Sequence, residues 1–202
     1  MSILAGVSSK RDDGEKVADL ELIRRFKKGD ENAFSSIVLK YQERLLRTAQ
    51  TILGNEEEAK DISQETFVKA YFNLKKFRGD SNLYTWLYRI LYNLCISSLR
   101  RKKIIPFLSL AENDDSKYFV SKLPDPIQET ERREFHAAVT EALNSLPVRQ
   151  RTVFVMKQID GLKHNEIANI MGITEGAVKA SYFHAVRKLR NLLSQYGENH
   201  GM

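Results

Sequence analysis

Cysteine, histidine and long apolar runs are all scarce in this 202-residue chain. Cys95 is the only cysteine, which excludes an internal disulfide or a multi-cysteine zinc site and fits a reducing compartment. The four histidines are scattered along the sequence, so we expect no metal site and no cofactor. No apolar run approaches the roughly 20 residues of a membrane-spanning helix, and the N-terminus lacks a signal peptide's order of basic and apolar residues. We therefore expect a cytoplasmic protein with no membrane insertion of its own.

The charge is positive overall and unevenly distributed. The formal net charge is +6 and the pI is about 9.3, which favours a polyanionic partner such as nucleic acid. Residues 100–103 form an unbroken basic run, and Arg187, Lys188 and Arg190 close the last strongly patterned segment. The span from Glu112 to Glu134 is net acidic instead. Two basic regions therefore flank an acidic one.

The apolar residues from Leu20 onward recur with a helical period, and no stretch alternates like a strand. The sequence therefore predicts an all-α protein, with two small helical domains joined by an extended acidic linker. We expect a disordered N-terminus at 1–18, a first domain at 19–103, a linker at 104–125, a second domain at 126–194 and a frayed tail at 195–202.

Capping residues predict where the helices of the first domain begin and end. Asp30 can N-cap a helix that Gly54 ends, and Asn55 can N-cap the next. The predicted helices of this domain are 31–53, 56 to about 76, and about 83 to 102, the last preceded by a turn at 78–81. In the second domain, Pro126 suits the first position of a helix that Pro147 breaks.

Residues 162–179 fit a helix-turn-helix with Gly172 at the turn and Thr174 as N-cap of the second helix. The helical period of the apolar residues predicts that one stripe of the second helix is buried, formed by Val178, Tyr182, Ala185 and Leu189. The opposite surface, with its cations, small residues and one aromatic, suits the major groove of duplex DNA. The candidate residues for duplex DNA are Thr174, Glu175, Gly176, Lys179, Ala180, Ser181, Phe183, His184, Arg187, Lys188 and Arg190. The alternatives are a solvated helix pair, and a core position for Phe183 if the phase is off by one residue.

The predicted helix at 83–102 is apolar almost all round except on one face, which holds Trp86, Arg89, Asn93, Ser97 and Arg100. An aromatic, amide and arginine face on an otherwise buried helix suits unpaired bases, and its basic end suits the backbone. Trp86 could instead belong to the core, and Asn93 could be a solvated or capping amide.

The predicted helix at 56–76 has a second exposed face beside its buried one. Asp61, Glu65, Val68 and Phe72 join acidic groups to apolar surface, with Gln64 at the border. This combination suits a protein partner better than nucleic acid. The alternative is a solvated acidic face.

These segments together resemble the extracytoplasmic-function sigma factors of bacterial RNA polymerase. Glu58–Tyr71 is similar to the family's region 2.2, Phe77–Asn93 to region 2.3 with its preceding loop, and Arg100–Lys103 to the end of region 2.4. Leu146–Arg190 is similar to region 4. The resemblance implies a DNA-binding subunit that performs no chemistry, recognises the −10 and −35 promoter elements, and helps open the −10 region.

The resemblance also implies a role for each surface. It assigns core polymerase binding to Asp61, Gln64, Glu65, Val68 and Phe72. It assigns the −10 element to Arg78, Gly79, Asp80, Ser81, Asn82, Trp86, Arg89, Asn93, Ser97, Arg100, Arg101 and Lys102, and the −35 element to the helix-turn-helix residues above. The implied partners are the polymerase clamp and flap, promoter DNA and an anti-sigma factor. The acidic linker would thread through the polymerase cleft, or be a passive tether.

Some positions depart from the family pattern, so the preferred promoter sequence cannot be transferred. Many relatives carry an acid where Ser97 stands, and arginines where Ser181, His184 and Val186 stand. Two other classes of function remain open. A self-sufficient repressor or activator would bind its operator without polymerase, and a nuclease would need clustered carboxylates or a histidine site.

Overall fold

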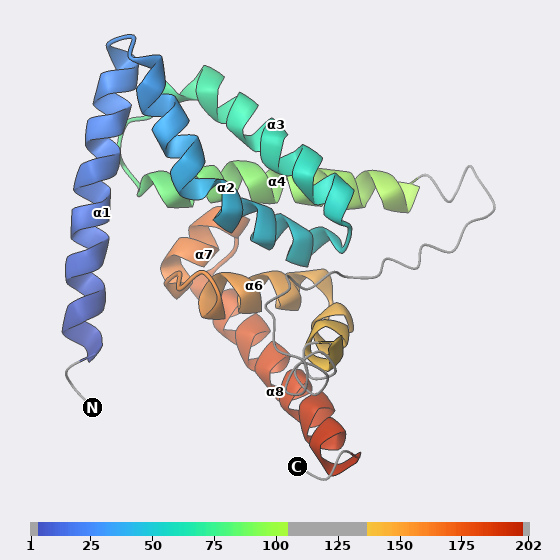
Figure 1. The fold of residues 1–202 in the computed structure, drawn as a ribbon. Helices are drawn as coiled ribbons and strands as arrows, with labels where there is room; N and C mark the ends of the chain where they lie inside the picture. Colours follow the sequence, from blue (N-terminus) through green and yellow to red (C-terminus); the bar gives the residue numbers. More distant parts are fainter. Residues whose placement is uncertain (1–3, 105–136, 200–202) are drawn as a thin grey trace, which may run out of the picture.

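The computed structural model describes residues 4–104 and 137–199, with side chains described for 16–102 and 137–194. Every regular element within these ranges is helical. The N-terminal domain consists of α1 (Leu4–Lys27), α2 (Glu31–Leu53), α3 (Glu56–Leu74) and α4 (Leu83–Ile104), and the C-terminal domain contains α6 (Val148–Gln158), α7 (His164–Met171) and α8 (Glu175–Asn199), preceded by helical residues 137–144. Figure 1 shows α6 and α7 against one side of the N-terminal bundle, with α8 packed on α6 and α7 and extending away from the bundle. No described helix is long and apolar enough to cross a bilayer.

The predicted caps of the N-terminal domain are confirmed. Asp30 Oδ1 accepts a hydrogen bond from the backbone N–H of Asn32 at 3.0 Å, and Asn55 Oδ1 accepts one from Glu58 at 2.8 Å. Gly54 ends α2 in the left-handed region at φ 76°. Each cap satisfies backbone groups that the helix itself leaves without a partner, so local chemistry defines these helix ends.

Helix α1 begins at Leu4, within the segment 1–18 for which the sequence predicts disorder. Packing and polar contacts anchor its C-terminal half: Ile23 and Phe26 are buried, and the Asp19 carboxylate accepts from Tyr41 Oη at 2.5 Å and from Lys40 Nζ at 2.6 Å. Once a helix is nucleated, each further residue adds one backbone hydrogen bond, so an anchored helix extends beyond its apolar stripe. Helices are predicted from the periodicity of apolar residues, so the sequence does not indicate that a polar residue such as Asp19 anchors α1.

The tail also differs from the expectation of fraying after 194, since α8 continues through Gly197 to Asn199. Ile104, the first residue of the predicted linker at 104–125, is the last residue of α4. The rest of that linker and the start of the helix at Pro126 lie outside the described residues. The remaining helix ends agree with prediction to within about two residues, the ordinary uncertainty of a helix boundary.

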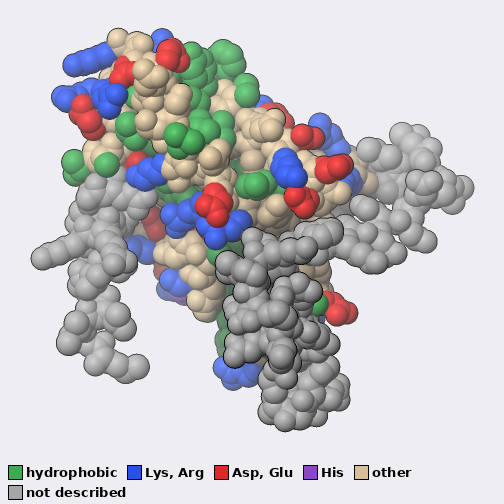
Figure 2. All heavy atoms as spheres, in the orientation of Figure 1, with side chains coloured by type: hydrophobic (Ala, Val, Ile, Leu, Met, Phe, Trp, Pro, Cys, Tyr) green, Lys and Arg blue, Asp and Glu red, His purple; other side chains and the backbone are tan. Residues whose placement is uncertain are grey.

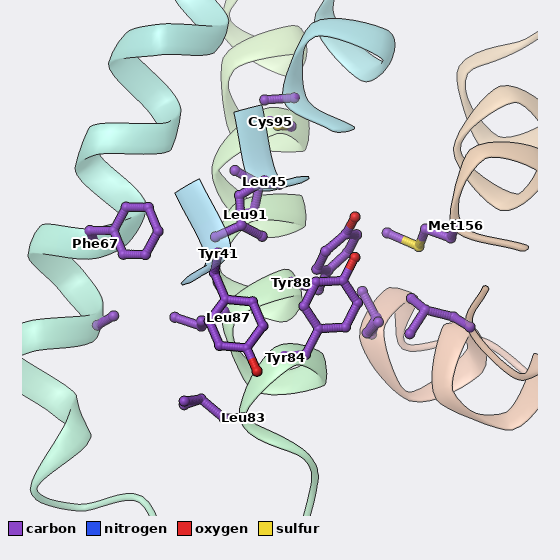
Figure 3. Packing of buried hydrophobic residues seen from close by; sticks show 14 of the residues in the cluster. Tyr41, Leu45, Phe67, Leu83, Tyr84, Leu87, Tyr88, Leu91, Cys95 and Met156 are labelled. Carbon is purple, nitrogen blue, oxygen red and sulfur yellow. The ribbon is translucent and has the colours of Figure 1, made fainter. Parts of the chain in front are cut away.

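The core of the N-terminal domain forms where α2, α3 and α4 meet. Tyr41 and Leu45 of α2 and Leu87 and Leu91 of α4 are all at most 1% exposed (Figure 3). Cys95 lies in the same cluster, and burial raises the pKa of its thiol to about 12. The core fixes α4 on most sides and leaves one strip of it available.

Candidate nucleic-acid and protein interfaces

An open groove of about 510 Å³ runs between α3 and α4. We call it the Trp86 groove; its lining is Lys69, Asn73, Lys76, Phe77, Trp86, Ile90, Asn93, Leu94 and Ser97. Three of the predicted −10 residues, Trp86, Asn93 and Ser97, therefore lie together. The Trp86 ring is half-buried and packs against Phe77 with centroids 5.3 Å apart, so it is both a wall of the groove and part of the core periphery.

The α3 side of this groove was missed by the sequence analysis. Lys69, Asn73 and Lys76 line it, and the Asn73 amide donates to the Lys69 carbonyl at 2.8 Å. Lys69 and Asn73 are four residues apart and so lie on one face of α3, and Lys76 follows the end of the helix. That spacing was the available signal in the sequence. Lys69 also pairs with Glu65 at 3.3 Å. The groove thus combines aromatic walls, two amides, a hydroxyl and two ammonium groups.

The loop before α4 contributes to a second cavity, of about 360 Å³. We call it the loop cavity; Arg78, Asp80, Ser81 and Arg89 line it, together with Asn169 and Ile170 of α7. Gly79 has φ 82°, a left-handed conformation that other residues adopt only with strain. Lys27 Nζ donates to the Phe77 carbonyl at 2.6 Å, which ties the start of the loop to α1. Seven of the predicted −10 residues therefore line two adjoining cavities, and Trp86 lines both.

The three cations with described side chains at the basic end of α4, Arg100, Arg101 and Lys102, are exposed but not equivalent. Lys102 Nζ lies 2.8 Å from Glu58 Oε2 on α3, and Ser98 donates to the same carboxylate. Burial opposes the charged form of Glu58, but the hydrogen bonds from Lys102 and Ser98 outweigh it and hold the pKa below its ordinary value. Lys102 therefore joins α4 to α3, whereas Arg100 and Arg101 remain exposed for contact with a phosphate backbone.

The two predicted faces of α3 are confirmed by burial. Ile62, Thr66, Phe67, Ala70 and Leu74 are buried against the core. Asp61, Gln64 and Glu65 are exposed, and Val68 and Phe72 are 54% and 71% exposed. An exposed apolar pair beside acids is suited to a protein partner. On the side drawn in Figure 2, acidic and basic side chains are interspersed over the N-terminal domain instead of forming one patch of a single sign.

The helix-turn-helix geometry is also confirmed. Gly172 ends α7 with φ 65°, and Thr174 Oγ1 accepts from the backbone N–H of Ala177 at 3.2 Å. Val178, Ala185 and Leu189 are buried as predicted, and the half-buried Tyr182 stacks on Phe154 with centroids 6.3 Å apart. Phe183 is 61% exposed, which excludes the core alternative for it.

Two residues predicted for the DNA-reading face of α8, Ser181 and Lys188, make hydrogen bonds within the chain instead. The helical phase of the sequence predicts Ser181 at one edge of the exposed face, but the residue is buried and its hydroxyl donates to the Ala177 carbonyl at 2.8 Å. The packing of α8 closes that edge. Lys188 Nζ donates to the Ser145 carbonyl at 2.6 Å, joining α8 to the segment before α6.

The rest of the predicted set on α8 is exposed. These residues are Thr174, Glu175, Gly176, Lys179, Ala180, Phe183, His184, Arg187 and Arg190. Lys179 pairs with Glu175 at 2.8 Å, and the Arg187 guanidinium lies 5.9 Å from the Phe183 ring centroid. A Cβ added at Gly176 would meet no atom within 4 Å, so packing inside the chain does not require glycine there. The N-terminus of α8 is consequently exposed, and another molecule can approach it.

Comparison with known proteins gives matches over both domains. Residues 37–104 match the family described as Sigma-70 region 2, and residues 136–189 match Sigma-70, region 4. The chain is 34% identical to the RNA polymerase sigma-H factor of Pseudomonas aeruginosa, over 83% of its own length and 89% of that protein. It is 35% identical to the ECF RNA polymerase sigma factor SigW of Bacillus subtilis, over 85% and 94% of the two chains.

Solved structures resemble the fold as well. CnrH in complex with the cytosolic domain of CnrY is 26% identical, with a TM-score of 0.66 over 88% of this chain and 98% of that one. RpoE of Bartonella quintana, in complex with the anti-sigma factor NepR, has a TM-score of 0.67 at 24% identity over 80% and 96% of the two chains, a likeness of fold. With relatives above 30% identity along most of its length, the chain belongs to the extracytoplasmic-function (ECF) sigma factors of the sigma-70 family, non-enzymatic subunits of RNA polymerase that direct transcription initiation.

Proposed function

We propose that the Trp86 groove captures one unpaired base of the −10 element. The observation that carries this proposal is the union of the Phe77–Trp86 wall with the polar groups of Asn93 and Ser97 in one open groove. Extruding a base costs a few kcal/mol, and stacking on an aromatic ring returns about 1–3 kcal/mol per base. The cost of extrusion and the gain from stacking nearly cancel. Hydrogen bonds from the Asn93 amide and the Ser97 hydroxyl therefore decide whether capture is favourable and which base is accepted.

The surroundings of the groove supply contacts to the nucleic-acid backbone. We assign Arg78, Arg89, Arg100 and Arg101 to phosphates, because all four are exposed cations beside the groove or at the end of α4. Gly79 and Asn82 shape the loop, and Asp80 and Ser81 line the loop cavity with it. Lys69 and Lys76 extend the same positive surface along α3.

The C-terminal domain reads duplex DNA at the −35 element through α8 in this proposal. The exposed start of the helix, at Thr174 to Gly176, can approach the backbone, since helix N-termini favour phosphates. Phe183 and His184 lie farther along the exposed face and can reach base edges, and the exposed Arg187 can contact a phosphate. Ser181 has no direct part, because it is buried.

The exposed face of α3 is the docking site for core RNA polymerase. Val68 and Phe72 would be desolvated on docking, and the carboxylates of Asp61 and Glu65 would select a basic partner surface. We further propose that an anti-sigma protein controls the chain, as CnrH is bound to the cytosolic domain of CnrY. Like the polymerase it serves, the protein would act in the cytoplasm.

Run-off transcription with core polymerase and a promoter library tests the function. We expect promoter-specific initiation that core polymerase alone does not give, and its absence across suitable polymerases would refute the proposal. Replacing Asn93→Ala should lower initiation about ten- to a hundred-fold, since a lost base contact costs about 1–3 kcal/mol. Gln42→Ala, at an exposed position of α2, is the matched control and should be as active as the parent.

A second experiment addresses the docking face. The double variant Asp61→Lys with Glu65→Lys should lose binding to core polymerase, measured by gel filtration or fluorescence anisotropy. Glu43→Lys with Glu141→Lys reverses two exposed acids on other helical segments and should bind normally. Equal affinity of the two double variants would contradict the assignment. A stand-alone regulator would instead bind promoter DNA tightly without polymerase.

A further inference from the structure

Helix α1 is held against the N-terminal bundle in one register. The buried carboxylate of Asp19 accepts a hydrogen bond from the Tyr41 hydroxyl of α2 at 2.5 Å. Two turns farther along α1, the Phe26 ring is 1% exposed, and its centroid lies 5.4 Å from that of Phe34 and 5.3 Å from that of Tyr71. A polar contact and an aromatic contact, two turns apart, therefore fix both the height and the rotation of α1 on the bundle.

The neighbouring face of α1 runs beside the loop between α3 and α4 (Figure 1). Leu20 and Lys27 are seven residues apart, so they lie on one side of the helix, two turns from each other. Lys27 Nζ donates to the Phe77 carbonyl at 2.6 Å. A Cβ built on Gly79 would lie 3.6 Å from Leu20 Cδ2, an ordinary van der Waals distance. Helix α1 thus contacts the loop at two points, one polar and one apolar.

This loop, residues 75–82, forms few hydrogen bonds of its own. The backbone N–H of Phe77 donates to the Leu74 carbonyl at 3.1 Å, but among the described residues positions 78–81 take part in no backbone–backbone hydrogen bond. Gly79 has a left-handed φ of 82°. A segment with so few backbone hydrogen bonds opens easily when nothing else holds it. The conformation of the loop therefore depends on contacts from outside it.

The residue that Lys27 holds forms part of the Trp86 groove. Phe77 is 7% exposed, and its ring packs on that of Trp86 with the centroids 5.3 Å apart. Both aromatic residues line the Trp86 groove and the loop cavity. The hydrogen bond to the Phe77 carbonyl therefore acts on the aromatic wall assigned to the unpaired base, and Leu20 acts on the glycine two residues farther along.

A loop that is ordered before DNA arrives favours base capture. A flexible loop that becomes ordered on binding loses conformational entropy, and that loss reduces the affinity. The cost of extruding a base and the gain from stacking it nearly cancel, so an added ordering cost would disfavour capture. Contacts with α1 hold the loop in shape in the free chain, and the ordering cost is then absent from the binding step.

We infer that α1 positions this loop: Leu20 and Lys27 hold residues 77–79 in the conformation that receives the unpaired base. Both are positioning residues, since neither is among the described residues that line the Trp86 groove or the loop cavity. Helix α1 also precedes residues 37–104, which match Sigma-70 region 2, so that match assigns it no role. The inference rests on the proposed function for its consequence in DNA binding, whereas the contacts belong to the free chain.

Trp86 is the only tryptophan of the chain, so its fluorescence reports on the loop without any DNA. Lys27→Met removes the ammonium group that holds the Phe77 carbonyl and keeps a long side chain. In the full-length free protein it should increase quenching of Trp86 by acrylamide, a neutral quencher, because the Phe77 ring covers the indole less closely. Lys27→Arg retains a donor and should restore the quenching of the parent. Lys28→Met removes the same charge at the next exposed position and is the matched control.

Leu20→Ala tests the apolar contact in the same assay. It removes the side chain beside Gly79 and should increase quenching with no change in charge. Val17→Ala, at a position 69% exposed one turn earlier on α1, is its matched control. Helix content by circular dichroism accompanies each measurement. Quenching equal to that of the parent in either folded variant, or an equal increase in its control, would overturn the inference.

Binding of a single-stranded −10 oligonucleotide to the complex with core polymerase measures the consequence. Lys27→Met should weaken this binding about three- to ten-fold, since one hydrogen bond from a charged donor is lost at a partly exposed site. Affinity for −35 duplex should stay unchanged, which a general loss of folding would not give. Unchanged affinity for the −10 strand would overturn the role in capture.

Asn93→Ala separates this inference from the proposed function, because Asn93 lines the groove itself. If Asn93→Ala binds the −10 strand as tightly as the parent does, the proposed base capture is wrong, and the quenching results still decide whether α1 positions the loop. If Asn93→Ala binds weakly and Lys27→Met binds normally, base capture stands and the positioning role is wrong.

Discussion

The two long helices that face nucleic acid, α4 and α8, are built in opposite ways. Helix α4 is enclosed: Leu83, Leu87 and Leu91 are at most 2% exposed, and its polar strip forms a wall of a groove. Helix α8 is buried along one stripe only, and from Thr174 to Arg190 most of its surface is open. An enclosed site can hold a single extruded base, whereas an open helix can enter the major groove of a duplex. The degree to which neighbouring helices enclose each helix therefore distinguishes a site for a single base from a surface for duplex DNA.

The variant with the largest expected effect on this contrast changes the core that packs against α4. Leu87→Ala should reduce the free energy of unfolding by about 2–5 kcal/mol, because the fully buried side chain leaves a cavity in close-packed surroundings. Val178→Ala removes a side chain that is also fully buried, on α8, and should cost less, because it removes two carbon atoms instead of three and leaves a smaller cavity. Urea unfolding of both variants measures the difference. A larger loss for the α8 variant would contradict the contrast in enclosure.

Gly176→Ala tests whether the start of α8 approaches DNA closely. The added methyl group meets no atom of the chain, so stability should stay the same or rise slightly. If the backbone there contacts phosphate, affinity for −35 duplex in the polymerase complex should fall roughly ten-fold, equivalent to about 1.4 kcal/mol. Footprinting on a −35 promoter fragment provides the measurement. The same affinity as the parent would place the DNA farther along the helix.

Arg187→Ala tests the contribution of charge on the open helix. Loss of one phosphate contact should reduce the slope of log affinity against log salt by about 1 and should weaken binding to different sequences alike. A change confined to one promoter base would instead assign Arg187 to base reading. Titrations of polymerase complexes at several salt concentrations distinguish the two results.

Ser181→Ala should have the smallest effect. The hydroxyl bonds to a carbonyl of its own helix, and the residue is buried, so we expect unchanged promoter preference and a stability change within about 0.5 kcal/mol. Promoter selection from a randomised −35 library is the measurement. Altered sequence preference would restore Ser181 to the DNA-reading surface.

Much of the site could be predicted from the sequence, and the exceptions have physical causes. The acid and apolar pattern of α3 identified an exposed face correctly, because helical phase alone separates Phe72 from Leu74. Lys69 and Asn73 were missed because a groove needs two helices, and their separation along the chain from Asn93 conceals it. Ser181 was misplaced because its position at the edge of a stripe depends on how closely the neighbouring helices pack.

The sequence by itself determined the helices, their caps and the likeness to sigma factors, since caps such as Asp30 and Thr174 act within a few residues of chain. Tertiary structure alone decided that α1 begins at Leu4 and that the Trp86 groove has two sides. It also decided that Asp160 joins the domains, because contacts between Asp160 and Arg44 or Thr48 span more than 100 residues. Local chemistry follows neighbouring residues, whereas burial depends on which distant surfaces meet.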